Sequence, residues 1–285
     1  MTSPISTVGV VGSGIMAAGI VEVIATAGYN VVVRARTSAG ADAVRTTIER
    51  RLTKMVERGK CTADDQSTII ARISGTEHLA DLAPCDLVIE TIVEDLGIKK
   101  NLMAELGTHL ADQAIITTNT STLPVVELAM ASQRPDRVAG LHFFNPATAM
   151  TLVEIVRPIT ASDETIAALH QFSANCGRQI VEVADRAGFV VNALLFPYLN
   201  AAIALTERGT ASIDDVDTAM KGGCGFPLGP FELLDLVGLD TSLSILETLY
   251  REFGDASMVP HPALRRLVAA GHLGRKTGRG FRNHT

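Results

Sequence analysis

The amino-acid sequence has no tryptophan, only three tyrosines and only four cysteines in 285 residues. No two of the cysteines approach CxxC spacing, and no HExxH motif occurs; the cysteines are Cys61, Cys85, Cys176 and Cys224. These absences argue against a disulfide scaffold and a zinc cluster, so we expect no metal and a reducing, cytoplasmic compartment. The 25 Lys and Arg are outnumbered by 31 Asp and Glu, and the formal net charge of −6 argues against a nucleic-acid partner.

One long apolar run raises the question of whether the chain spans a membrane. Residues 187–206 carry no formal charge, and a run of that length can span a bilayer. The run nevertheless contains Asn192, Pro197 and Asn200, and we interpret it as a buried helix of a protein without membrane contact. No basic segment precedes the first apolar run of the sequence, so we expect no secretory signal.

The length is typical of two domains, and the pattern changes near residue 184. Before it, short apolar runs at 8–11, 31–33, 87–89, 115–117 and 138–144 alternate with helical patterns, including a charged helical hairpin within 41–72. Alternation of this kind predicts an α/β fold, a Rossmann-type doubly wound and mostly parallel sheet. We therefore expect a dinucleotide-binding domain over 1–184.

After residue 184 only helical patterns remain, at 188–208, 212–221, 230–253 and 262–271, and they predict an all-helical domain over 185–285. These helices are more apolar than a domain of this size needs for its own core, which indicates a subunit interface and a homodimer. The last thirty residues are basic, with six Lys and Arg and no acid after Asp255. This tail is either a solvated surface or faces a phosphate-bearing ligand.

A glycine turn follows the first predicted strand and opens a helix. It reads Gly12-Ser-Gly14-Ile-Met-Ala17, the Gly/Ala variant of the dinucleotide fingerprint. Gly12 permits the tight turn, Gly14 lets the backbone approach a pyrophosphate, and Ala17 keeps the helix close to the strand. The motif predicts binding of a nicotinamide dinucleotide at the helix N-terminus.

The second strand does not end in the acid that grips a ribose 2′-hydroxyl. It continues as Arg34-Ala35-Arg36, and no acid occurs before Asp42. A guanidinium suits a 2′-phosphate, so this segment favours NADP(H) or dual use over strict NAD(H). The alternative is that both arginines are solvated surface charges.

Polar residues are densest between Thr117 and Glu154, in an otherwise apolar region. His142 lies at the end of an apolar strand, and Glu154 stands within the aliphatic run 152–156. A buried glutamate is costly unless it is paired, and a buried histidine is a natural partner. The pair could be catalytic or merely structural, or Glu154 could be an edge charge facing water.

The sequence resembles the 3-hydroxyacyl-CoA dehydrogenases from about residue 8 to residue 281. The resemblance rests on the Gly-x-Gly-x-Met turn, on Glu94 with the lysines that follow, and on several longer motifs in the right order. These are Asn119-Thr-Ser121, His142-Phe-Phe-Asn-Pro146, Leu152-Val-Glu154-Ile-Val156, Gly188-Phe-Val-Val-Asn192, Pro227-Leu-Gly-Pro-Phe-Glu-Leu233 and Gly274-Arg-Lys276-Thr-Gly-Arg-Gly-Phe281. Without a fused hydratase, the chain is most similar to stand-alone bacterial 3-hydroxybutyryl-CoA dehydrogenases.

The resemblance implies roles for particular residues. His142 would be the general acid and base, Glu154 would orient it, and Ser121 and Asn192 would bind the substrate oxygens. The residues matching cofactor contacts, beside the fingerprint and the two arginines, are Glu94, Lys99, Asn145 and Lys276. Lys54, and less surely Arg51, match the hairpin that contacts coenzyme A. The sequence departs from the family pattern at Ala35, Ala17 and Ala193, and the first departure bears on cofactor choice.

The resemblance thus implies an NAD(P)-dependent oxidoreductase that interconverts (3S)-3-hydroxyacyl-CoA and 3-oxoacyl-CoA, with 3-hydroxybutyryl-CoA favoured, in fatty acid β-oxidation or related metabolism. One alternative is a relative that acts on a free hydroxy acid or sugar acid. Another is a non-catalytic protein that kept the fold, which the joint presence of Ser121, His142, Glu154 and Asn192 disfavours.

Overall fold

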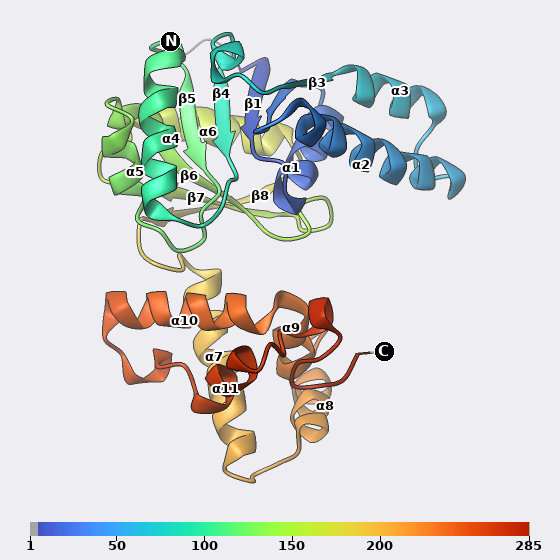
Figure 1. Ribbon diagram of the computed structural model, residues 1–285, viewed down its shortest axis with the longest axis vertical. Coiled ribbons are helices and arrows are strands. Elements are labelled where there is room, and N and C mark those ends of the chain that lie inside the picture. Colours follow the sequence, from blue (N-terminus) through green and yellow to red (C-terminus); the bar gives the residue numbers. More distant parts are fainter. Residues whose placement is uncertain (1–4, 285) are drawn as a thin grey trace. The chain divides into compact units, whose positions relative to one another are not determined.

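The computed structural model describes residues 5–284, and the chain divides into two compact units, Met1–Asp185 and Arg186–Thr285 (Figure 1). Unit 1 is built on one eight-stranded sheet in the order β3-β2-β1-β4-β5-β6-β7-β8. Strands β1 to β6 are parallel, β7 is antiparallel to β6, and β8 is parallel to β7. The predicted fold class is confirmed. The strands are β1 Thr7–Val11, β2 Asn30–Arg34, β3 Ile73–Thr76, β4 Leu87–Glu90, β5 Ile115–Thr118, β6 Val138–Phe143, β7 Leu152–Arg157 and β8 Gln179–Ala184.

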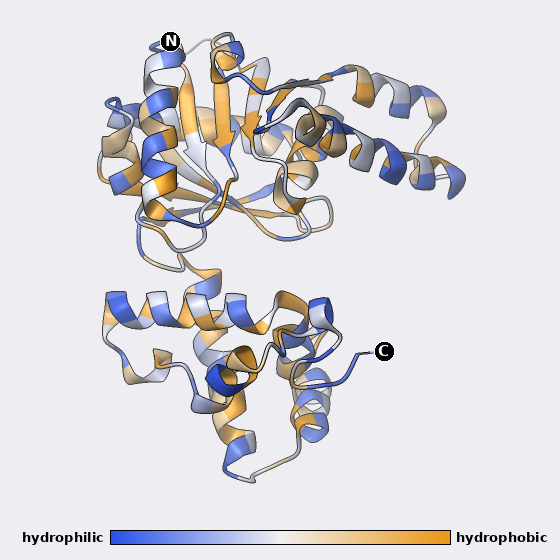
Figure 2. Cartoon of the chain, viewed as in Figure 1, coloured by the Kyte–Doolittle hydropathy of each residue, from blue (hydrophilic) through white to orange (hydrophobic). Residues whose placement is uncertain are grey.

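Helices cover both faces of this sheet, and the side chains of its central strands are therefore buried on both sides. One apolar core joins the sheet to α1 (Ile15–Thr26), α6 (Asp163–Asn175) and the hairpin helices. The second core joins the other face to α4 (Leu96–His109), α5 (Val125–Ala131) and the short helix η1 (Leu79–Leu82). Figure 2 shows the hydrophobic residues concentrated in the strands and on the inward faces of the helices. A further short helix, η2, spans Pro135–Arg137.

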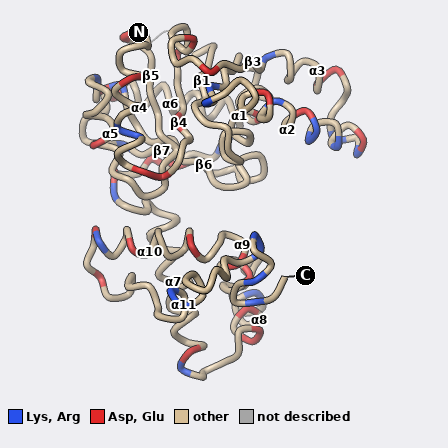
Figure 3. Tube along the Cα trace, in the orientation of Figure 1, with Lys and Arg blue, Asp and Glu red and all other residues tan. Residues whose placement is uncertain are grey.

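The predicted hairpin consists of α2 (Ser38–Glu57) and α3 (Ala63–Ala71), which extend from the β3 edge of the sheet (Figure 1). Helix α2 begins earlier than expected because the Thr37 hydroxyl caps it, accepting from the N–H of Gly40 at 3.1 Å. Helix α3 begins with a capping box between Thr62 and Asp65. Figure 3 shows charges of both signs along the hairpin, as expected for a solvated surface.

Strands β3, β7 and β8 were not predicted as strands. Strand β8 lies at the sheet edge with most of its side chains exposed, so its sequence lacks the apolar run by which the five predicted strands were recognised. Strand β7 matters more for function, because an antiparallel neighbour of β6 places residues of the two strands directly opposite each other.

Unit 2 is helical, apart from isolated bridges that Arg279 makes with Gly274 and Asn283. The predicted run 230–253 is two helices, separated at Gly238, whose φ of +104° is unfavourable for other residues. Among the described residues no helix is both long enough and apolar enough to cross a membrane. The helices are α7 Val191–Glu207, α8 Ile213–Cys224, α9 Pro230–Val237, α10 Leu239–Phe253, η3 Ala256–Met258, α11 Pro262–Ala269 and η4 Arg275–Thr277.

Most cations of the basic tail pair with acids of earlier helices in unit 2, while the side chains of Arg265, Arg266 and Lys276 stay exposed. Lys276 lies 2.6 Å from Asp240, and Arg282 lies 2.7 Å from the buried Asp217. Asp235, also buried, accepts hydrogen bonds from the tail backbone and from His284. The tail is therefore held against the earlier helices of unit 2 by hydrogen bonds and ion pairs. The other paired cations are Arg265, with Glu247, and Arg266, with Glu207.

The structure separates the four thiols into two classes. Burial raises the pKa of Cys85 to about 11 and that of Cys176 to about 12, whereas Cys224 is exposed and Cys61 half-buried. Because the thiolate is the reactive form, we expect a disulfide reagent at neutral pH to modify two thiols rapidly and the other two only after denaturation. Peptide mapping should identify the rapid sites as Cys61 and Cys224; rapid labelling of Cys85 or Cys176 would contradict the assignment.

Candidate active site

The fingerprint turn lies between β1 and α1, at the carboxyl end of the sheet. Gly12 has a φ of +141°, and a Cβ there would lie 2.3 Å from the Thr91 hydroxyl oxygen, so only glycine fits. A Cβ on Gly14 would meet nothing within 4 Å, which means that the backbone is open to an approaching group. Ala17 is fully buried against the sheet. The turn has the geometry that a pyrophosphate requires.

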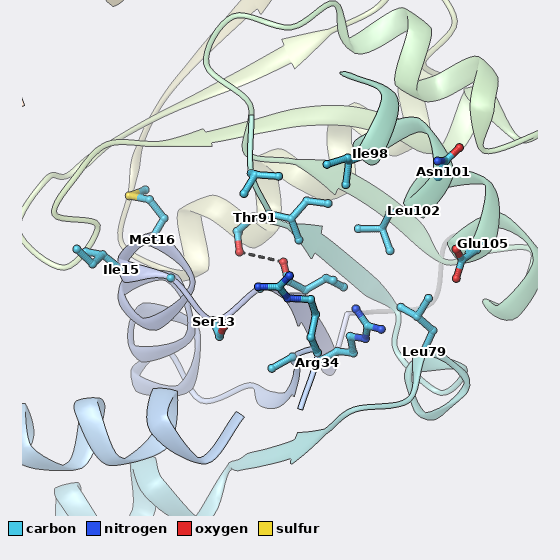
Figure 4. A pocket seen from close by; sticks show the side chains of 17 residues that line it. Ser13, Ile15, Met16, Arg34, Leu79, Thr91, Ile98, Asn101, Leu102 and Glu105 are labelled. Atoms are coloured by element: carbon cyan, nitrogen blue, oxygen red, sulfur yellow. Dashed lines mark hydrogen bonds between the residues drawn. The ribbon is translucent and has the colours of Figure 1, made fainter. Parts of the chain in front are cut away.

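A cavity of about 690 Å³ adjoins this turn (Figure 4). Its walls are largely apolar, with Leu79 and Leu102 among them, and its volume is in the range of small-molecule sites. Figure 4 shows Arg34 in the cavity between Ser13 and Leu79. The charged residues of the lining are Arg34, Arg36 and Glu105.

Arg34, at the end of β2, and Arg36, two residues beyond it, both line the cavity. Arg34 is half-buried and Arg36 is exposed. The Nε atom of Arg34 is buried and, within residues 5–284, has no hydrogen-bond partner. Ala35 is 3% exposed and follows the end of β2 between them. The cavity thus holds the Arg34 guanidinium, for which the described part of the chain provides no carboxylate within salt-bridge distance.

His142 and Glu154 face each other across the antiparallel strands β6 and β7. His142 Nδ1 lies 2.7 Å from a carboxylate oxygen of Glu154, and the two residues are 5% and 0% exposed. The alternative that Glu154 is a solvated edge charge is therefore wrong. A carboxylate at Nδ1 sets the tautomer and the orientation of the imidazole, which suits a general acid and base as well as a structural pair.

The loop after β5 carries Ser121 and is tied to the histidine strand. The side-chain oxygen of Asn119 accepts from the N–H of Phe143 at 2.8 Å, one residue beyond His142. Ser121 donates its N–H to a carboxylate oxygen of Glu94 at 2.9 Å, and the Thr120 hydroxyl donates to the same atom at 2.6 Å. Ser121, Glu94 and His142 are therefore brought to one end of the sheet.

Lys99 is almost completely buried, at 1% exposed, on α4. Its ammonium donates to Glu90 at 2.6 Å and to the carbonyl of Ile92 at 3.3 Å, and it lies 3.5 Å from Glu94. Glu90 is fully buried and was not singled out from the sequence. The signal was available, since Glu90 ends the apolar run 87–89 just as Glu154 interrupts the run 152–156.

The remaining predicted residues of unit 1 lie at its surface. Asn145 and Lys54 are exposed. Arg51 is 3.6 Å from Glu22 of α1 and donates to the hydroxyl of Thr148, in the segment that follows His142. Burial raises the pKa of the Glu22 carboxyl, and the Arg51 guanidinium opposes that shift. Arg51 thus joins α2 to α1 and to this segment.

Two predicted residues belong to unit 2. Asn192 is 9% exposed on the first turn of α7. Lys276 is exposed, and both carboxylate oxygens of Asp240 lie 2.6 Å from its ammonium. No group of three or more His, Cys, Asp or Glu that could hold a metal ion occurs within residues 5–284.

Family models account for nearly all of the chain. The model of the NAD-binding domain of 3-hydroxyacyl-CoA dehydrogenases matches residues 7–186, and that of their C-terminal domain matches residues 188–284. The chain belongs to the 3-hydroxyacyl-CoA dehydrogenase family. It is therefore a dehydrogenase, and its fingerprint turn and cavity belong to a nicotinamide dinucleotide-binding domain.

Relatives within the 3-hydroxyacyl-CoA dehydrogenase family match the chain over almost its whole length. A 3-hydroxybutyryl-CoA dehydrogenase of Mycobacterium tuberculosis is 43% identical over 283 residues, 99% of each chain. One of Clostridioides difficile is 40% identical, over 95% of this chain and 97% of the other. The crystal structure of (S)-3-hydroxybutyryl-CoA dehydrogenase from Ralstonia eutropha superposes with a TM-score of 0.96 at 39% identity, over 99% of each chain. The resemblance inferred from the motifs is confirmed.

Proposed function

We propose that the protein interconverts (3S)-3-hydroxyacyl-CoA and 3-oxoacyl-CoA, with the 3-hydroxybutyryl and acetoacetyl thioesters as the favoured pair. The observation that carries this proposal is the buried His142–Glu154 pair, joined through Asn119 and Phe143 to the loop that bears Ser121. Such short thioesters occur in fatty acid β-oxidation and related acyl-CoA metabolism. Relatives named 3-hydroxybutyryl-CoA dehydrogenase are 39–43% identical to the chain.

In the oxidative direction the hydroxyl proton of the substrate would pass to His142. With Nδ1 held by Glu154, the proton is exchanged at Nε2, and the carboxylate stabilises the imidazolium that forms. General acid and base assistance of this kind is worth roughly 10²–10⁴-fold in rate. The bound nicotinamide supplies the hydride acceptor, and Ser121 and Asn192 would hydrogen-bond the reacting oxygen.

The binding residues follow from the same family positions. The backbone at Gly12 and Gly14 would hold the pyrophosphate, with Ala17 keeping the helix close to the strand, and Glu94, Asn145 and Lys276 would contact the rest of the dinucleotide. Lys99 has its acceptors within the protein, so it would influence the cofactor through Glu94. Lys54, and less directly Arg51, would meet the phosphates of coenzyme A.

We also propose that the enzyme uses NADP(H) at least as well as NAD(H). Ala35 cannot accept from ribose hydroxyls and does not repel a 2′-phosphate, while Arg34 offers a guanidinium with a buried, unpartnered Nε. A charge-assisted hydrogen bond between arginine and phosphate is strong and geometrically specific. Arg36, exposed in the same cavity, is a second donor.

The deciding assay follows the absorbance of the reduced nicotinamide with acetoacetyl-CoA as substrate, separately with NADH and NADPH. We expect turnover with the thioester that is far faster than with free acetoacetate. Equal or faster reduction of the free acid would instead identify a hydroxy-acid dehydrogenase. No reduction of either substrate with either cofactor would overturn the proposed activity.

We propose that the protein is a cytoplasmic homodimer and that the two subunits associate through unit 2. Unit 2 exposes large apolar side chains over several of its helices; they are Val190, Leu194, Leu205, Phe226, Leu236, Tyr250, Phe253 and Val259. Exposed apolar area of this kind marks protein interfaces. Sedimentation equilibrium should give twice the chain mass of 30.2 kDa, and a single species of 30.2 kDa across micromolar concentrations would contradict the proposal.

A further inference from the structure

The carboxylate of Glu90 is completely enclosed at the end of β4. One oxygen accepts from the Lys99 ammonium and from the N–H of Ile92, both at 2.6 Å, and the other accepts from the Thr118 hydroxyl at 2.6 Å. A buried carboxylate is retained at such a site only when it is paired and hydrogen-bonded. Glu90 is both, so it is a fixed anchor for Lys99.

Lys99 in turn lies between two carboxylates. Its ammonium contacts Glu90 at 2.6 Å and lies 3.5 Å from Glu94, while the carbonyl of Ile92 accepts a third contact. With two hydrogen-bond acceptors, a second carboxylate at 3.5 Å and 1% exposure, the ammonium has little freedom to move. The nearer partner, Glu90, therefore determines how strongly Lys99 attracts Glu94.

Glu94 divides its two oxygens between Lys99 and the Ser121 loop. The oxygen Oε2 faces Lys99, and the oxygen Oε1 accepts from the Ser121 N–H and the Thr120 hydroxyl. The Ser121 hydroxyl itself is 3.4 Å from Oε1. The orientation of one carboxylate therefore sets the place of the loop, and a chain of charges leads from Glu90 to Ser121.

We propose that Glu90 is a positioning residue that holds Ser121 in place through Lys99 and Glu94. The inference rests on the proposed function, in which Ser121 contacts the reacting oxygen. Without the Glu90 charge, the Lys99 ammonium would draw the Glu94 carboxylate toward itself and away from the Ser121 N–H. Glu90 itself touches neither substrate nor cofactor.

Hydrogen exchange of the free protein tests the positional part without substrate. In Glu90→Gln we expect faster exchange over the backbone segment 119–123 than in the wild type, because the hydrogen bond from Ser121 to Glu94 weakens. Glu127→Gln is the matched control, since it removes the carboxylate partner of the neighbouring Lys100 in an exposed pair 3.1 Å apart. Unchanged exchange over 119–123 in Glu90→Gln would overturn the proposal.

Kinetics in two backgrounds test whether Glu90 acts through Ser121. Loss of a residue that orients a metal ligand typically costs roughly 10–100-fold in activity, and by analogy we expect a loss of that order in kcat/KM for acetoacetyl-CoA from Glu90→Gln. In a Ser121→Ala background the same substitution should cost less than about 3-fold, because coupled residues are non-additive. An equal loss in both backgrounds would indicate a general structural defect and overturn the positioning role.

A second variant covers the case in which Glu90→Gln does not fold. Glu90→Asp keeps the buried charge but withdraws it by one methylene group from Lys99, so exchange over 119–123 should again be faster than in the wild type, by a smaller factor. Glu90→Gln combined with Lys99→Met also removes the ammonium that would draw Glu94 away, so its exchange should stay near that of the wild type. Absence of turnover in the wild type would refute the proposed function, whereas normal wild-type turnover with unchanged exchange in Glu90→Asp would refute only the role of Glu90.

Discussion

Replacement of His142 by glutamine should reduce kcat by about 10³-fold or more, while the affinity for the dinucleotide stays near that of the wild type. Glutamine approximates the size of the imidazole and can hydrogen-bond Glu154, but it cannot exchange a proton near neutral pH. The cofactor cavity does not include His142 among its lining residues, which is why binding should survive. Steady-state kinetics with acetoacetyl-CoA and fluorescence titration with reduced cofactor measure the two effects; with no tryptophan, the protein adds little background emission.

The surface pair His170–Glu182 provides a matched control. Its ring nitrogen and carboxylate oxygen are 2.9 Å apart, close to the 2.7 Å of the proposed catalytic pair, but both side chains are over one third exposed. We expect His170→Gln to retain wild-type kcat within about 2-fold, because surface pairs contribute little. If His142→Gln kept more than a tenth of the wild-type kcat, His142 would not be the general acid and base.

The substitution Arg34→Ala, which removes the guanidinium, should lower kcat/KM for NADPH by roughly 10- to 150-fold. This is the equivalent of about 1.5–3 kcal/mol for a charge-assisted contact. NADH, which lacks the 2′-phosphate, should be affected less than about 3-fold. The reverse change, Ala35→Asp, introduces the acid that the resemblance leads one to expect at this position. It should shift the ratio of the two kcat/KM values toward NADH, because a carboxylate accepts from ribose hydroxyls and repels a phosphate.

Arg45→Ala controls for the general loss of a positive charge, since Arg45 is exposed on α2 and does not line the cavity. Its ratio of NADPH to NADH activity should match that of the wild type. Strict dependence of the wild type on NADH, with no NADPH turnover, would show that neither arginine recognises a phosphate. The kcat/KM values for NADPH and NADH should be measured at one salt concentration for the wild type and the three variants. Salt screens charge interactions, so a constant concentration makes the differences between the proteins comparable.

Local sequence patterns were sufficient to predict a feature when one contiguous segment contains all the residues that define it. The turn from Gly12 to Ala17 is contiguous, and its neighbours on both sides identify a strand and a helix, so the dinucleotide fold was predicted correctly. Glu90 could have been noticed as an acid at the end of an apolar run, but its pairing could not, because its partners Lys99 and Thr118 lie 9 and 28 residues away. Arg34 shows the same limit, since whether a guanidinium meets water or a cavity depends on Leu79 and Leu102, which come from other elements.

The sequence by itself determined the alternation of strands and helices, the fingerprint turn, and the family, because each depends on residues that are adjacent or periodic along the chain. The tertiary structure decided that Glu154 is buried opposite His142 rather than solvated, because only the antiparallel register of β6 and β7 brings them within 2.7 Å. It also decided that cations of the basic tail pair within the helical unit, since their partner carboxylates come from helices up to 68 residues away. Such pairings follow from the packing of distant elements, which no local pattern of residue types records.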